Sequence, residues 1–190
     1  PVVLLRKITV PVFFRLLYSS GIRTIEARML NVGDVDLEHG ILNIRHSKGP
    51  SQHFVALHDT MLDLLKRYDA AIKVLYPERE YFFPAHNGTC HRRAWVQCNF
   101  HELWSMYNSS YATAYELRHH YATENINQWI GEGFEFDSKL LYLSKSMGHS
   151  TLESTRYYYS LVPAMADILE KLSGRSFDDI VPEVDDEEGQ

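Results

Sequence analysis

Three short runs between residues 35 and 57 constrain the fold of this chain most. Residues 35–37, 41–45 and 53–57 are rich in the apolar and β-branched residues that form strands. Turn-forming residues separate them at 38–40 and 47–51. Because connections this short join antiparallel neighbours, we expect a small three-stranded antiparallel meander.

Outside these runs, apolar residues recur at helical spacing. The pattern predicts helices over residues 9–19, 23 or 24–30, 59–75, 92–107, 114–127 and 138–147, with further helices opening at Thr151 and at Pro163. Asp59 or Thr60 is the expected N-cap of the third helix, and Gly148 is expected to close the sixth. Residues 81–84 form an expected short buried segment. The predicted fold class is mainly α with a small three-stranded antiparallel sheet, an α+β fold.

The acidic residues are unevenly distributed. The chain of 190 residues has a net charge of -6, but seven of its acids lie in residues 178–190, which contain no Lys or Arg. Without them the body has 18 acids against 19 Lys and Arg. We therefore expect one domain over residues 1–177 and an acidic tail over 178–190 that does not pack. The net charge neither suggests nor excludes a nucleic-acid partner.

The start of the chain, its apolar runs and its two cysteines indicate where in the cell the protein is expected. The chain begins at Pro1 inside an apolar run, which favours a piece of a longer protein. Its apolar runs are too short to span a bilayer, and no secretory signal pattern is present. Cys90 and Cys98 match no metal-binding spacing, so we expect reduced thiols in a cytoplasm.

The polar stretch from Met147 to Tyr159 is dense in groups that act on phosphates. His149 follows Gly148, and Arg156 precedes three consecutive tyrosines, 157–159. A tyrosine hydroxyl can attack phosphorus, but its ordinary pKa of about 10 means that it needs nearby cations and proton-transfer groups. Taken alone, the histidine could instead be structural and the tyrosines ordinary core or surface aromatics.

Candidate cations occur upstream. Arg23 lies three residues before Glu26, within reach on one helix face. The two could form a weak surface ion pair, or Glu26 could hold the guanidinium of Arg23 so that it faces a phosphate. Lys48 lies in a predicted hairpin loop. It could be an ordinary solvated lysine, or it could donate a proton to a leaving oxygen. Tyr115 and Arg118 share one expected helix face. The adjacent histidines 119 and 120 make a poor metal pair, so packing or a supporting role is expected for His119 and no metal is predicted.

Taken together, these motifs resemble the catalytic domain of tyrosine site-specific recombinases, the family of phage and transposon integrases. The matching stretches run in the family's order from about Thr9 to Leu161: Gly21-Ile22-Arg23-Thr24-Ile25-Glu26, Lys48 between the second and third strands, Tyr115-Glu116-Leu117-Arg118-His119, and Met147-Gly148-His149 followed by Tyr158. One position departs from the pattern, because Tyr115 stands where the family usually has histidine.

The resemblance implies DNA strand cleavage and rejoining through a 3′-phosphotyrosyl intermediate, without metal or cofactor. Tyr158 would be the nucleophile, Arg23 and Arg118 would stabilise the phosphate oxygens, and Lys48 would protonate the leaving oxygen. His149 would hydrogen-bond the phosphate or assist proton transfer. Tyr115 would hydrogen-bond the phosphate oxygens, with Glu26 and His119 in support. DNA would be contacted by Arg23, Lys48 and Arg118, and also by Arg156, which has no catalytic counterpart in the family.

The resemblance also implies partners and an origin. These are double-stranded DNA at specific sites, a tetramer of protomers on that DNA, and an N-terminal DNA-binding domain in the full-length chain. The implied origin is bacterial, from a phage or other mobile element. Three alternatives stay open from the residues: relaxation of DNA in the manner of a type IB topoisomerase, a non-catalytic DNA-binding relative, and a plain helical interaction domain.

Overall fold

The computed structural model describes residues 2–45, 52–129 and 135–149 of the chain. The predicted turn at 131–133, the helices opening at Thr151 and Pro163, and the acidic tail lie outside these residues. The chain divides into two compact units, of which the first contains residues 1–121 and 146–148 and the second contains residues 122–145 and 149–190.

The first unit begins with helix α1, Val2–Ser20, which is longer than the helix predicted over residues 9–19. Val2, Val3 and Leu4 are exposed and Leu5 is the one buried side chain among residues 2–8, so the first turns show little of the burial that produces a helical apolar pattern. The prediction therefore started the helix too late. Pro11 lies inside α1, although proline lacks the N–H that an interior helical position normally donates.

The predicted meander is confirmed. Strands β1 (Val35–Asp36), β2 (Ile41–Ile44) and β3 (His53–Ala56) form one antiparallel sheet in the order β1-β2-β3. The 3₁₀ helix η1, Val32–Asp34, leads into it. Side chains alternate across the sheet, as the two-residue period of a strand requires, so Leu42, Ile44 and Val55 are buried.

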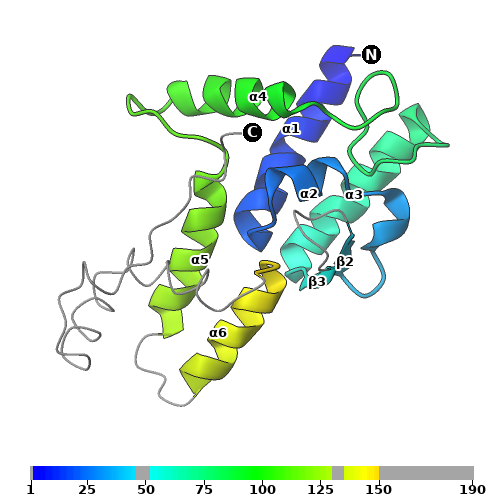
Figure 1. Ribbon diagram of the computed structural model, residues 1–190. Helices are drawn as coiled ribbons and strands as arrows, with labels where there is room; N and C mark the ends of the chain where they lie inside the picture. The colour runs from blue at the N-terminus through cyan, green and yellow to red at the C-terminus, as the bar shows by residue number, and fades with distance from the viewer. Residues whose placement is uncertain (1, 46–51, 130–134, 150–190) are drawn as a thin grey trace. The chain divides into compact units, whose positions relative to one another are not determined.

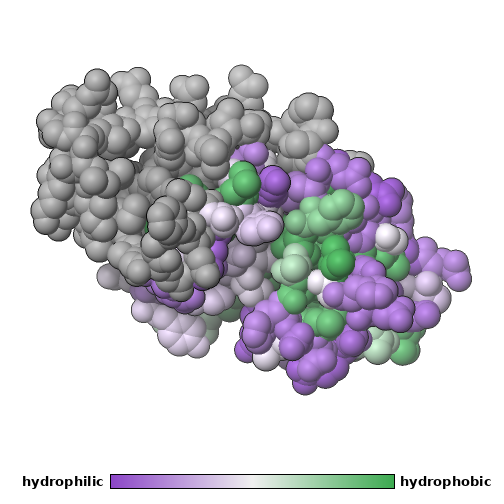
Figure 2. All heavy atoms as spheres, turned by 90° about the horizontal axis from the view of Figure 1, so that it is seen from below, coloured by the Kyte–Doolittle hydropathy of each residue, from purple (hydrophilic) through white to green (hydrophobic). Residues whose placement is uncertain are grey.

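The other face of the sheet is open. Ile41 and Phe54 are exposed there and line a hollow together with Asn43 and residues 33–36. Figure 2 shows hydrophobic side chains interrupting a largely hydrophilic surface on one face of the molecule. The sheet thus contributes only one of its two faces to the core.

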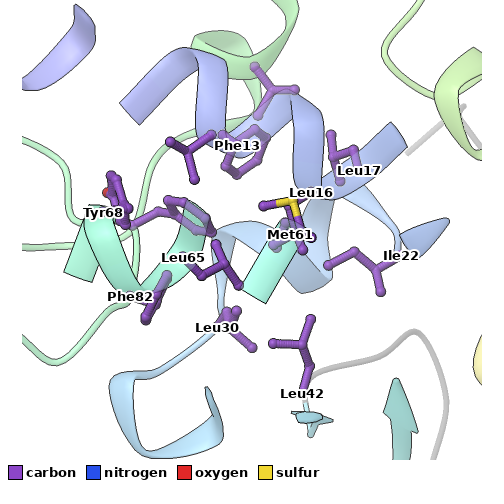
Figure 3. Close-up of a cluster of buried hydrophobic side chains, with 14 of the residues drawn as sticks. Phe13, Leu16, Leu17, Ile22, Leu30, Leu42, Met61, Leu65, Tyr68 and Phe82 are labelled. Carbon is purple, nitrogen blue, oxygen red and sulfur yellow. The ribbon is translucent and has the colours of Figure 1, made fainter. Parts of the chain in front are cut away.

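The core lies between α1 and α3, Asp59–Leu75, which pack side by side (Figure 1). Figure 3 shows the buried side chains of both helices pointing towards one another, with Leu30, Leu42 and Phe82 closing the cluster. The predicted buried segment is confirmed, because Phe82 and Phe83 are 1% and 0% exposed. The N-cap prediction was wrong by one position, since the ring of His58 accepts the N–H of Thr60 in place of a hydroxyl or carboxylate.

Three further helices follow: α4 at Arg93–Ser105, α5 at Glu116–Trp129 and α6 at Glu135–Ser146. Each lies within three residues of its predicted bounds at both ends, as expected for frayed helix termini. Ala122, Ile126, Leu140 and Leu143 are buried side chains of the second unit. The mainly α fold with a small antiparallel sheet is thereby confirmed. No helix among the described residues is long and apolar enough to cross a membrane.

Candidate active site

Arg23 and Glu26 form a tight local unit at the start of α2, Thr24–Arg28. The Glu26 carboxylate accepts the backbone N–H of Arg23 at 2.7 Å and its guanidinium NH1 at 2.9 Å. The Glu26 side chain is fully buried, and that of Arg23 is 17% exposed. Since both charges are largely removed from solvent, this is the held guanidinium that the spacing allowed and not a surface ion pair.

Arg118 comes from the first turn of α5 and is almost completely buried, at 2% exposure. Its NH1 donates to the carbonyl oxygen of Gly21 at 2.6 Å, and its NH2 donates to the carbonyl oxygen of Met147 at 2.7 Å. These two carbonyls belong to segments 97 and 29 residues away along the chain. A carbonyl oxygen orients a guanidinium without removing its charge, so the bonds fix the direction of a buried cation.

The two arginines converge on one backbone atom. NH1 of Arg23 also donates to the carbonyl oxygen of Met147, at 3.4 Å, so this oxygen receives both guanidinium groups. All of these residues lie in the first unit. Two permanently charged guanidinium groups are thus held close together, and the guanidinium is a group suited to bind a phosphate or another oxyanion.

Two glycines let aromatic rings approach this centre closely. Gly21 ends α1 with φ +64°, and a Cβ at this position would lie 2.2 Å from the ring of Tyr121. Gly148 has φ +65°, and a Cβ there would lie 2.5 Å from the ring of His53. Both glycines adjoin the site, since Gly21 supplies one of the carbonyls and Gly148 follows the other. Burial raises the pKa of the Tyr121 hydroxyl, with a smaller opposing effect from its hydrogen bond to Ser146.

Tyr115 precedes the first residue of α5 and is partly exposed. Its carbonyl oxygen accepts the N–H of Arg118 at 2.9 Å, which closes the first turn that carries this arginine. Its ring meets that of His119 edge to face, with centroids 4.7 Å apart. His119 therefore packs against Tyr115.

The remaining predicted site residues fall in other parts of the chain. His149 belongs to the second unit, where its backbone N–H donates to the carbonyl oxygen of Ser144 at 3.0 Å. This bond and the positive φ of Gly148 close α6 in the predicted manner. Lys48, Arg156 and Tyr158 lie outside the described residues.

Sequence reasoning missed the groups that orient the arginines. The carbonyls of Gly21 and Met147 carry no side-chain signal, and His53 and Tyr121 belong to no recognised motif. The glycines at 21 and 148 were the available hint, because a glycine beside a motif often permits a close approach. Among residues 2–45, 52–129 and 135–149, no group of three or more His, Cys, Asp or Glu side chains is placed to hold a metal ion.

Comparison with solved structures defines the class of fold. The chain is similar to the XerA recombinase, with a TM-score of 0.66 and 18% identity over 92% of this chain and 60% of that one. It is also similar to the XerH recombinase in a post-cleavage complex with a palindromic difH substrate, with a TM-score of 0.68 and 21% identity over 90% of this chain and 46% of that one. The fold is that of tyrosine recombinase catalytic domains.

The family follows from sequence. The model of the phage integrase family matches residues 5–164, and the chain belongs to this family. The chain is 28% identical over 184 residues to y4rE of Sinorhizobium fredii, whose name carries the provisional description integrase/recombinase, with 93% of this chain and 58% of that protein covered. It is 28% identical over 148 residues to the tyrosine recombinase XerC of Proteus mirabilis, with 76% and 45% covered. The chain thus spans about half the length of these relatives.

Proposed function

We propose that this chain is the catalytic domain of a site-specific DNA recombinase that cuts and rejoins strands through a covalent 3′-phosphotyrosyl intermediate. The observation that carries the proposal is the convergence of Arg23 and Arg118 on the carbonyl oxygen of Met147. Membership of the phage integrase family supports the same reaction class. The proposed domain covers residues 1–177, followed by the acidic segment 178–190.

The two arginines would stabilise charge on the scissile phosphate. In phosphoryl transfer the non-bridging oxygens must be held and their charge neutralised while one P–O bond replaces another. Arg118 is fixed by two backbone carbonyls and Arg23 by a buried carboxylate. Because these groups are oriented before DNA arrives, little reorganisation is needed during the reaction.

The remaining roles complete the reaction. The hydroxyl oxygen of Tyr158 attacks phosphorus, the bond from phosphorus to the 5′ oxygen breaks, and Lys48 gives the leaving oxygen its proton. His149 hydrogen-bonds the phosphate or assists proton transfer, while the Tyr115 hydroxyl donates a further hydrogen bond. The phosphodiester energy is kept in the tyrosyl link, so a second 5′ hydroxyl can reverse the step on another strand without a cofactor.

The partners proposed for the whole protein are double-stranded DNA with specific sites and three further protomers in a tetramer. Arg156 is proposed to contact the DNA backbone, and a DNA-binding domain preceding this chain would bind the duplex together with the catalytic domain. Since this chain covers 46% of the XerH chain solved with DNA, that similarity leaves room for such a domain. The proposed origin is a phage or another mobile element, with the reaction taking place in a bacterial cytoplasm.

A covalent trapping experiment tests the reaction. The full-length protein is incubated with a library of nicked duplexes carrying randomised half-sites, so that a cleaved strand diffuses away and leaves a denaturant-resistant protein–DNA adduct. We expect an adduct from the wild-type protein and none from Tyr158→Phe, whereas Tyr157→Phe and Tyr159→Phe serve as neighbouring controls that retain it. An adduct that persists in Tyr158→Phe would contradict the assignment of the nucleophile.

The same selected DNA separates the proposal from its alternatives. Two copies of the site on one supercoiled plasmid should give recombined products. Relaxed plasmid without such products would identify a topoisomerase-like enzyme instead. Specific binding without any adduct would identify a non-catalytic relative.

A further inference from the structure

His53 lies at the start of the last strand of the sheet. It is the first residue of β3, and in the antiparallel register it lies opposite Ile44, the last residue of β2. The His53 side chain is turned into the protein, at 8% exposure, whereas the next side chain, Phe54, is 63% exposed on the opposite face of the sheet.

The ring of His53 is packed against the backbone of Gly148. A Cβ built on this glycine would lie 2.5 Å from Cε1, 2.7 Å from Nδ1 and 3.0 Å from Nε2 of the imidazole. Real Cβ atoms do not approach other heavy atoms this closely, so the ring occupies the space of the side chain that Gly148 lacks. The positive φ of Gly148 favours glycine for a second, independent reason.

This contact lies one residue from the atom on which both arginines converge. The carbonyl of Met147 forms the peptide bond with Gly148, so any shift of the Gly148 backbone moves the acceptor of Arg23 and Arg118. His53, Gly148 and Met147 all lie in the first unit. The imidazole thus connects the start of β3 to the backbone that orients the two arginines.

We infer that His53 is a positioning residue of the strand-cleavage reaction, which holds the Met147–Gly148 peptide in place against the start of β3. The inference rests on the proposed function. His53 acts through the backbone, and DNA need not touch it. A displacement of about 1 Å in an active site can lower a reaction rate by about 100-fold, so a packing contact at this position is sufficient to matter.

The test measures cleavage and binding separately in the full-length protein. His53→Ala should lower the single-turnover cleavage rate at saturating DNA by about 10- to 100-fold. Its affinity for DNA, measured in a Tyr158→Phe background, should stay within about twofold of the parent. Phe54→Ala is the matched control, because it removes an aromatic ring from the adjacent residue on the exposed face and should leave the rate unchanged.

A compensating pair makes the test specific for the contact with Gly148. Gly148→Ala should lower cleavage by at least about 100-fold, because the added methyl group collides with the imidazole ring. Combining it with His53→Ala removes that collision, and the double variant should cleave at least about tenfold faster than Gly148→Ala alone. Thermal unfolding of each variant identifies the assay temperature at which all are folded.

Two results would overturn the inference. One is a wild-type cleavage rate in folded His53→Ala, which would leave the proposed function intact. The other is a double variant no faster than Gly148→Ala, which would show that the ring and the glycine act independently. Failure of the wild-type protein to form any Tyr158-dependent adduct is a distinct outcome, in which the proposed function fails and the inference falls with it.

Discussion

The guanidinium of Arg118 donates to the carbonyl oxygen of Met147 at 2.7 Å, although the two residues come from helical regions 29 positions apart. The same side chain donates to the carbonyl of Gly21, so one buried arginine joins Gly21 to Met147 within the first unit. This cation is therefore both a part of the candidate site and a structural link. Substitutions that change it should affect stability and activity together.

Arg118→Ala should lower the free energy of unfolding by about 2–4 kcal/mol. The change leaves two buried carbonyl oxygens without their charged donor, and each such loss costs about 1–3 kcal/mol. Chemical denaturation of the wild-type and variant chains measures the difference. Arg67→Ala, in α3, is the control, because a change at a position away from the site should fall within about 0.5 kcal/mol of the wild type. An equal stability for Arg118→Ala would contradict the bonding described for this arginine.

Glu26→Ala should lower the free energy of unfolding by about 1–3 kcal/mol and should also reduce DNA cleavage. The buried carboxylate accepts both the backbone N–H and the guanidinium of Arg23, so its removal deprives a largely buried cation of its counter-ion. Glu26→Gln keeps an oxygen for the backbone N–H but removes the charge.

The two Glu26 variants separate the two roles of the carboxylate. If charge is what holds Arg23, Glu26→Gln should cleave DNA more slowly than the wild type while retaining more stability than Glu26→Ala. Denaturation and the covalent trapping assay give the two measurements. A Gln variant with full cleavage activity would show that the ion pair is dispensable for orienting the arginine.

Gly21→Ala should destabilise the chain by at least about 2 kcal/mol. Its methyl group would lie 2.2 Å from the ring of Tyr121, and φ is +64°, a region that alanine rarely adopts. Gly33→Ala is a matched control, since nothing lies within 4 Å of a Cβ at that position. We expect a large decrease in midpoint temperature for Gly21→Ala and little change for Gly33→Ala. Similar midpoints for the two variants would argue against close packing at Gly21.

The buried His91 should make stability depend on pH between about 4 and 6.5. Burial, and then the nearby Arg28 guanidinium, lowers the pKa of His91 to about 4, against about 6.5 in an unfolded chain. As the pH falls through this window, the unfolded state binds a proton that the folded state excludes, so the free energy of unfolding decreases. The free energy of unfolding should decrease by on the order of 2 kcal/mol across this window. This is less than the pKa difference alone would give, because solvent screens part of the interaction.

A comparison of two histidine variants isolates this contribution. His91→Phe keeps a flat ring to stack on Trp95 and should flatten the pH dependence between 4 and 6.5. His101→Gln changes an exposed histidine of α4 and should leave it as in the wild type. Denaturation curves at half-unit pH steps provide the measurement. A profile that keeps its slope in His91→Phe would assign the effect to other groups.

Local patterns in the sequence were sufficient to predict most of the fold. The alternating strands at 35–57 and the turn residues between them predicted the meander, because strand period and turn chemistry act over a few residues. Gly148 predicted the end of α6 for the same reason. The start of α1 and the His58 cap were mispredicted, because the first turns bury little apolar surface and histidine is an uncommon capping residue.

The candidate site likewise contains contacts between neighbours in the sequence, which could be predicted, and contacts between distant residues, which could not. Arg23 and Glu26 are three residues apart, so their pairing is a local consequence of helix geometry that the sequence could predict. Arg118, Gly21 and Met147 are separated by up to 97 residues, and two of the three groups involved are backbone carbonyls. No side-chain pattern encodes which carbonyl a buried guanidinium will meet.

By itself, then, the sequence determined the mainly α class with its small sheet, the family resemblance and the residue types able to act on a phosphate, since these depend on short-range patterns and on chemical identity. Only the tertiary structure decided that Arg23 and Arg118 share the Met147 carbonyl and that the His53 ring takes the place of a side chain on Gly148. Those contacts join segments distant in the chain, and they form only where packing of the whole unit brings the segments together.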